Sequence, residues 1–295
     1  MEHRTRRLRN LFSLAESRRR DLVTATCALT LLPALVAVAA AQPVVIRKEA
    51  LTQRLDTQVF LVFDTSLSMS ARSGLQSPTR LERSKLEAEA LVPRLGDIPV
   101  GIATLTDRIL PNLMPTTNVG LVARTIHQSV QIDEPPPSVR YHGRASTLDA
   151  LIPVGNDGLF APGVKHRILV IFTDGEERRP PPVTGYTWIA DQVTVPPIFV
   201  HVWAPTERIY VHGQPDPNYR PDPTSGHVLS KFTALTHGQV LPEGDVGGLL
   251  YTIRRAAGSN PARTMTLGYA RIALAPWFLL AGVIPLGFLL YRRNW

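Results

Sequence analysis

With 295 residues, of which 44% are hydrophobic and 19% charged, the chain can form one substantial core and still include membrane segments. Its formal net charge of +8 comes largely from one end, where Phe12 is the only aromatic residue, so the charge does not indicate nucleic-acid binding. A single cysteine, Cys27, excludes a disulfide framework and a cysteine-rich metal site. The N-terminal arginines, at residues 4, 6, 7, 9, 18, 19 and 20, predict a basic cytoplasmic tail over residues 1–21.

The first hydrophobic segment, residues 22–41, is uncharged throughout. A helix of this length matches a hydrocarbon layer of roughly 30 Å, so the segment is predicted to be a transmembrane helix or signal anchor. The alternative is a cleaved secretory signal, because Ala37, Ala39 and Ala41 before Gln42 resemble a cleavage site. We favour the uncleaved anchor, and both readings stay open.

A second hydrophobic segment covers residues 272–291, between Arg271 and a short tail, residues 292–295. Trp277 and Tyr291 suit a membrane interface, and the arginines suit its ends, which favours a transmembrane helix over a buried core helix. Both arginine-rich tails are then expected in the cytoplasm. Residues 43–270 would then lie on the other side of the membrane, which in a bacterium is the periplasm or the cell exterior.

The region between these segments alternates between strand and helix patterns. Apolar runs predict strands at 57–63, 100–104, 167–173 and 198–203, and amphipathic patterns predict helices at 79–95, 119–132, 228–235 and 246–256, with another starting at 146–151. Residues 205–226, rich in proline and aspartate, are predicted to be a long loop or a small hairpin excursion. We predict an α/β domain over residues 57–256, with a doubly wound, mostly parallel sheet and linkers at 42–56 and 257–271.

Oxygen-bearing side chains follow the predicted strands, where loops of a doubly wound sheet converge. One group follows strand 57–63, a second follows strand 167–173, and a third lies in the loop starting at Gly143. Carboxylates and hydroxyls without histidine or thiol partners suit a hard cation, Mg²⁺ or, by substitution, Mn²⁺. The candidate ligands are Asp64, Ser66, Ser68, Ser146, Thr147 and Asp174.

The strings DTSLS at 64–68 and TDGEE at 173–177 resemble the metal-ion-dependent adhesion site (MIDAS) of the von Willebrand factor A (VWA) family. The resemblance implies a Rossmann-like fold, with direct coordination by Ser66 and Ser68. Asp64 and Asp174 would act directly or through water. A position would stay open for an acidic residue of a partner protein.

The third MIDAS loop departs from the family. Its members commonly have Gly-Gly-Thr or Gly-Thr, whereas this chain has Gly-Arg-Ala-Ser-Thr at 143–147. Either Ser146 or Thr147 can supply the hydroxyl, and Arg144 would oppose cation binding if it pointed inward. Glu176 and Glu177 are expected in a solvated loop.

The likeness covers residues 57–256 and is closest to bacterial membrane A-domain proteins encoded near MoxR-type AAA+ ATPases, including the Bat and Mxa groups. It implies a membrane-embedded docking protein that binds an acidic partner segment and assists assembly or metal loading of a periplasmic enzyme. The alternatives are an adhesion or envelope-stress component and a metal-dependent hydrolase. No Gly-x-Ser-x-Gly elbow or phosphate-binding Gly-x-x-x-x-Gly-Lys string is present, so an enzyme is not expected.

Overall fold

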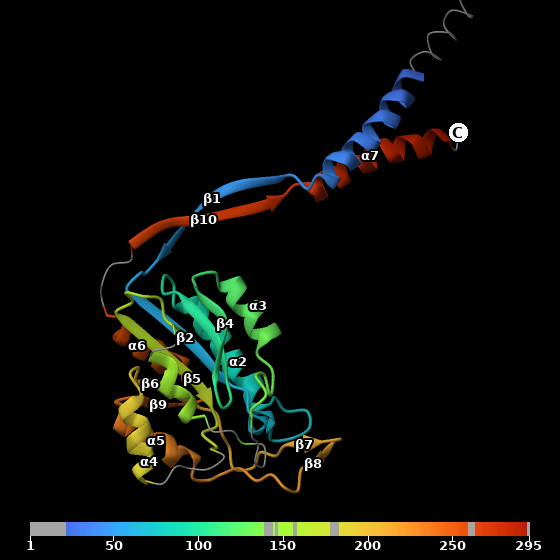
Figure 1. Ribbon diagram of the computed structural model, residues 1–295. Helices are drawn as coiled ribbons and strands as arrows, with labels where there is room; N and C mark the ends of the chain where they lie inside the picture. The colour runs from blue at the N-terminus through green and yellow to red at the C-terminus, as the bar shows by residue number, and fades with distance from the viewer. Residues whose placement is uncertain are drawn as a thin grey trace, which may run out of the picture. The chain divides into compact units, whose positions relative to one another are not determined.

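The computed structural model describes residues 22–138, 144, 147–155, 158–177, 183–258 and 263–293. It divides into two compact units (Figure 1). Leu51–Met265 holds a six-stranded sheet and its helices, and Met1–Ala50 with Thr266–Trp295 holds the two ends of the chain. The predicted domain of residues 57–256 lies within the first unit.

The six-stranded sheet has the order β4-β3-β2-β5-β6-β9. Neighbouring strands pair in parallel except β3 and β4, which are antiparallel. This confirms the mostly parallel α/β sheet expected from the sequence. The strands are β2 (Thr57–Asp64), β3 (Val100–Leu105), β4 (Ile109–Thr116), β5 (His166–Thr173), β6 (Pro197–His201) and β9 (Gln239–Pro242).

Both faces of the sheet are buried, which explains why its central strands are apolar runs rather than alternating patterns. Successive β2 side chains point to opposite faces. Val59, Leu61 and Phe63 join one core cluster with α2 (Arg80–Leu91), α3 (Val119–Ser129) and α6 (Val246–Ala257). Phe60 and Val62 join another with the 3₁₀ helix η3 (Asp149–Gly155), α4 (Val183–Gln192) and α5 (Ser225–Thr236).

The position of β2 between β3 and β5 creates the crevice in which ligands bind in such sheets. The chain passes from β2 to β3 on one side and later returns to place β5 on the other, so the strand order reverses at β2. Phe63 of β2 is in register with Phe172 of β5, and their rings stack with centroids 5.1 Å apart. The residues that follow, starting at Asp64 and Thr173, therefore begin side by side.

Several elements differ from the prediction. Helix 146–151 was expected, but the chain forms η3 from Asp149, and β4, α4 and β9 were not predicted. The β4 sequence, ILPNLMPT, contains two prolines, which an antiparallel edge strand tolerates and a central strand does not. The excursion at 205–226 contains the hairpin alternative, as strands β7 (Tyr210–Val211) and β8 (Gln214–Pro215).

The predicted linkers contain strands. β1 (Val44–Gln53) lies in segment 42–56, β10 (Arg263–Ala273) covers much of segment 257–271, and the two form a separate two-stranded sheet. The prediction missed them because each strand pairs with a partner at the far end of the chain. No local sequence pattern indicates a pairing between segments so far apart.

One of the two predicted membrane segments meets the length and composition of a span. Among the described residues, Leu22–Ala40 is the helix long and apolar enough to cross a membrane, whereas the apolar part of α7 (Ala275–Arg293) is the shorter Ala275–Tyr291. The second helix starts later than expected because Ile272 and Ala273 belong to β10. Inside this unit the two helices touch, since a Cβ built on Gly282 would lie 3.6 Å from Leu32 Cδ1.

Helix α2 begins with a capping box. The Thr79 hydroxyl accepts a hydrogen bond from Glu82 N at 3.1 Å, and Glu82 Oε2 accepts one from Thr79 N at 2.7 Å. The 3₁₀ turns η1 (Leu67–Ser70) and η2 (Val92–Arg94) flank this helix along the chain. The box fixes where α2 starts and therefore the position of its first residue, Arg80.

Thr79→Ala is expected to lower the free energy of unfolding by about 1 kcal/mol. The amide of Glu82 loses its acceptor, and the reciprocal bond from Thr79 N to the Glu82 carboxylate is weakened. Urea denaturation would measure this loss. Thr79→Ser, which keeps the hydroxyl, serves as the control and should stay close to the wild type. Equal stabilities for the alanine and serine variants would contradict the capping role.

Candidate metal site

The loop after β2 gathers buried oxygens at the end of the strand. Asp64 is 1% exposed; its Oδ1 accepts a hydrogen bond from Ser66 N at 2.9 Å, and its Oδ2 accepts one from Thr173 Oγ1 at 2.6 Å. The hydroxyls of Ser66 and Ser68, both buried, lie 3.0 Å apart. The residues of the DTSLS string thus converge as their spacing predicts.

The loop after β5 turns sharply at Gly175, which lets Asp174 face the same region. Gly175 has φ +68°, and a Cβ there would lie 2.9 Å from Leu229 Cδ1, so the turn requires glycine. Asp174 is fully buried, and its Oδ1 accepts a hydrogen bond from Glu176 N at 2.9 Å. Burial raises the pKa of Asp64 and of Asp174, and the negative charge of Asp64 raises that of Asp174 further.

The third loop is joined to the β5 loop through Glu177. The carboxylate of Glu177 accepts hydrogen bonds from Thr147 N at 3.1 Å, from Leu148 N at 3.0 Å and from the Thr147 hydroxyl. Burial raises the pKa of Glu177 to about 8. Ser146, the alternative ligand, lies outside the described residues.

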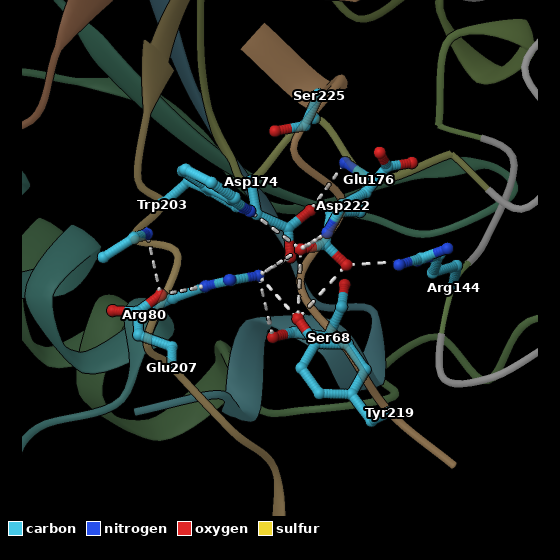
Figure 2. A network of polar contacts seen from close by, with 12 residues as sticks. Ser68, Arg80, Arg144, Asp174, Glu176, Trp203, Glu207, Tyr219, Asp222 and Ser225 are labelled. Carbon is cyan, nitrogen blue, oxygen red and sulfur yellow. Dashed lines mark hydrogen bonds and ion pairs between the residues drawn. The ribbon is translucent and has the colours of Figure 1, made fainter. Parts of the chain in front are cut away.

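Arg80, at the start of α2, reaches into the site (Figure 2). Its side chain is fully buried, and Nη1 donates to Asp174 Oδ2 at 2.7 Å, Glu176 Oε1 at 3.0 Å and the Tyr219 hydroxyl at 2.9 Å. Nε donates to Glu207 Oε2 at 2.6 Å. This role cannot be predicted from the sequence, because an arginine in the first turn of an amphipathic helix is usually solvated.

Glu176 connects the site to the excursion, residues 205–226. Besides Arg80, it accepts hydrogen bonds from the Tyr219 hydroxyl at 3.1 Å, Asp222 N at 3.1 Å and Trp203 Nε1 at 3.0 Å (Figure 2). Arg144 Nε pairs with its other oxygen at 3.1 Å. Glu176 and Glu177 are 1% and 4% exposed, so their predicted place in a solvated loop is wrong; both are buried because donors surround them.

The donor set fits a divalent cation. Within the described residues, no three histidine, cysteine, aspartate or glutamate side chains are grouped to hold a metal, so a cation would depend on the serine hydroxyls together with the two aspartates. The two aspartates also carry more negative charge than their described cationic partners offset, because the Arg80 that pairs with Asp174 is shared with Glu176 and Glu207, and Asp64 meets no cation within its described contacts. A dication would offset this surplus of negative charge.

Two solved structures share the arrangement of the domain. An aerotolerance-related membrane protein from Bacteroides fragilis is 19% identical, with a TM-score of 0.51 over 68% of this chain and 98% of that one. BatB from Bacteroides thetaiotaomicron is 20% identical, with a TM-score of 0.52 over 69% of this chain and all of that one, 100%. The domain has the same fold as these two proteins, that of a von Willebrand A domain. The resemblance predicted from DTSLS and TDGEE is confirmed at the level of the fold.

Other comparisons with the A domain are more distant or negative. A proximal thread matrix protein from mussel byssus, solved with zinc in its MIDAS motif, is 16% identical, with a TM-score of 0.41 over 70% of this chain and 49% of that one. No family model matches the chain, and no curated protein does.

Proposed function

We propose that the A domain binds a divalent cation, Mg²⁺ or Mn²⁺, through Asp64, Ser66, Ser68 and Asp174, with a further hydroxyl from Ser146 or Thr147. The observation that carries the proposal is the meeting of two buried aspartates and a pair of serine hydroxyls at the carboxyl ends of adjacent strands. Oxygen ligands of this kind suit a small hard cation that keeps some of its waters. A bound cation would supply a positive charge able to accept one more carboxylate ligand.

The role proposed for the site is docking of a protein partner that presents an acidic residue. Nothing in the described arrangement requires a chemical step at the proposed metal site, because the hydroxyls of Ser66 and Ser68 are paired with each other and, within the described contacts, no histidine meets either of them. A nucleophile would need a base directed at it. We therefore propose a binding module rather than an enzyme.

The chain is proposed to be anchored in a bacterial inner membrane, with both tails in the cytoplasm and the A domain in the periplasm. The apolar helix Leu22–Ala40 and the likeness to membrane proteins of the Bat type support the anchoring. The arginines at both ends of the chain support the orientation. In this setting the domain would belong to a membrane complex that cooperates with a MoxR-type ATPase in assembly or metal loading of a periplasmic enzyme.

Titration of Mn²⁺ and Mg²⁺ into the detergent-solubilised full chain, followed by calorimetry, tests the metal site. The wild type should bind one equivalent, and Asp174→Ala should lose at least about tenfold in affinity, because it removes a charged ligand. Capture of acidic peptides by the wild type should then require the cation and fail in chelator. Absence of binding by the folded wild type would overturn the proposal.

A further inference from the structure

Arg80 places a permanent positive charge against one of the proposed metal ligands. We propose that Arg80 is an internal cation that opposes metal binding at Asp174, and that the excursion, residues 205–226, holds it there. The inference rests on the proposed metal site and concerns how its affinity is set. The geometry of the guanidinium group carries it.

The first observation is the contact itself. Arg80 Nη1 lies 2.7 Å from Asp174 Oδ2, with both side chains fully buried. A cation at Asp174 would have to share this carboxylate with the guanidinium group, and two like charges would then face each other without water between them. Arginine stays protonated at any physiological pH, so the opposition is permanent.

The second observation is an incomplete set of hydrogen bonds. Arg80 Nη2 is buried and has no hydrogen-bond partner among the described residues, although Nη1 serves three side-chain acceptors. A buried donor without a partner is costly. The guanidinium group is therefore held by its acidic neighbours, Asp174, Glu176 and Glu207, even though one of its nitrogens is left without an acceptor.

The third observation is the contact between Arg80 and the excursion. Arg80 Nε donates to Glu207 Oε2 at 2.6 Å, and Glu207, 1% exposed, belongs to the excursion. Tyr219, from the same excursion, accepts from Nη1 and donates to Glu176. Figure 2 shows Arg80 reached by Glu207 from one direction and by Asp174 from another. Glu207 and Tyr219 of the excursion thus hold the Arg80 guanidinium group beside Asp174.

Arg83 provides a matched control on the same helix. It pairs with the same Glu207, through Nη2 at 2.8 Å, and with Glu243 at 2.5 Å, but none of its described contacts is with Asp174. Removing either arginine deletes one positive charge and one bond to Glu207. Only removal of Arg80 frees the proposed ligand.

The experiment is a titration of Mn²⁺ into the full chain in detergent, followed by electron paramagnetic resonance of the free ion, for the wild type, Arg80→Met and Arg83→Met. We expect Arg80→Met to bind Mn²⁺ about tenfold more tightly or better, and Arg83→Met to stay within about twofold of the wild type. Arg80→Met without metal should melt at a lower temperature, because Glu207 and Glu176 lose a partner, and Mn²⁺ should raise its melting temperature more than that of the wild type.

If Arg80→Met does not fold, the double variant Arg80→Met/Glu207→Gln takes its place in the titration, because it removes both partners of the Arg80–Glu207 ion pair. Unchanged or weaker Mn²⁺ binding by the folded variant, beside a wild type that binds, would overturn the inference and leave the metal site intact. Binding by the variant alone would uphold the inference and overturn the proposed function. No binding by either chain would overturn both.

Discussion

Asp64→Asn is expected to weaken Mn²⁺ binding by about a hundredfold or more without destabilising the metal-free protein. Asp64 is 1% exposed, and within the described contacts its oxygens meet only neutral donors, from the backbone and side chain of Ser66 and from Thr173 Oγ1. Burial raises the pKa of this carboxyl, so its charge is a cost in the absence of metal. Asparagine keeps the shape, and with its oxygen toward Ser66 N and its amide nitrogen toward the Thr173 hydroxyl, which can accept, it removes that cost together with the ligand charge.

Two measurements separate these effects. Calorimetric titration would report the loss of Mn²⁺ binding, and urea denaturation in chelator would report a free energy of unfolding at or above that of the wild type. Asp107→Asn is the control, since Asp107 lies outside the site and accepts from Ser138 N at 2.6 Å. It should keep metal binding. Full Mn²⁺ affinity in Asp64→Asn would contradict the assignment of Asp64 as a ligand.

In chelator, the free energy of unfolding is expected to fall as the pH rises from 5 to 8, by on the order of 3 kcal/mol from Glu177 alone. Burial raises the pKa of Glu177 from 4.5 to about 8, so the folded protein holds a proton that the unfolded chain has lost. A carboxyl group whose pKa is raised by folding contributes its full stabilisation at a pH below its pKa in the unfolded chain. This contribution is lost as the pH rises toward its pKa in the folded protein. Asp64, Asp174 and Glu176 are shifted in the same direction.

Urea unfolding at several pH values, with and without Mn²⁺, would measure this dependence. A dication should flatten the profile, because it favours the ionised aspartates. Glu177→Gln, which cannot ionise, should flatten the profile in chelator even without metal. A wild-type stability that rises from pH 5 to 8 in chelator would show that the buried carboxylates find enough positive charge inside the protein.

The two strands that position the site can be predicted from the sequence, because the patterns that indicate them are local. β2 and β5 are apolar runs that end in oxygen-bearing loops, and a strand buried on both faces can hardly have another composition. Asp64, Ser66, Ser68 and Asp174 follow from that frame and their spacing. The structure places them together, and their role as ligands stays a prediction.

What the sequence does not predict depends on contacts between distant segments. Arg80 is buried only because Asp174, Glu176 and Glu207, which lie about a hundred residues or more along the chain, surround it. Glu177 is buried by donors from Thr147 and Leu148, in the loop that precedes η3. Arginine and glutamate are usually exposed to solvent, so the sequence alone does not indicate that these residues are buried.

The pairing of β1 with β10 makes the A domain an insertion between two strands that leave it together. Pairing the two strands closes a long loop, and the contacts of the ribbon must offset the conformational entropy that this closure costs. A single proteolytic cut inside one strand would leave the domain held by the other.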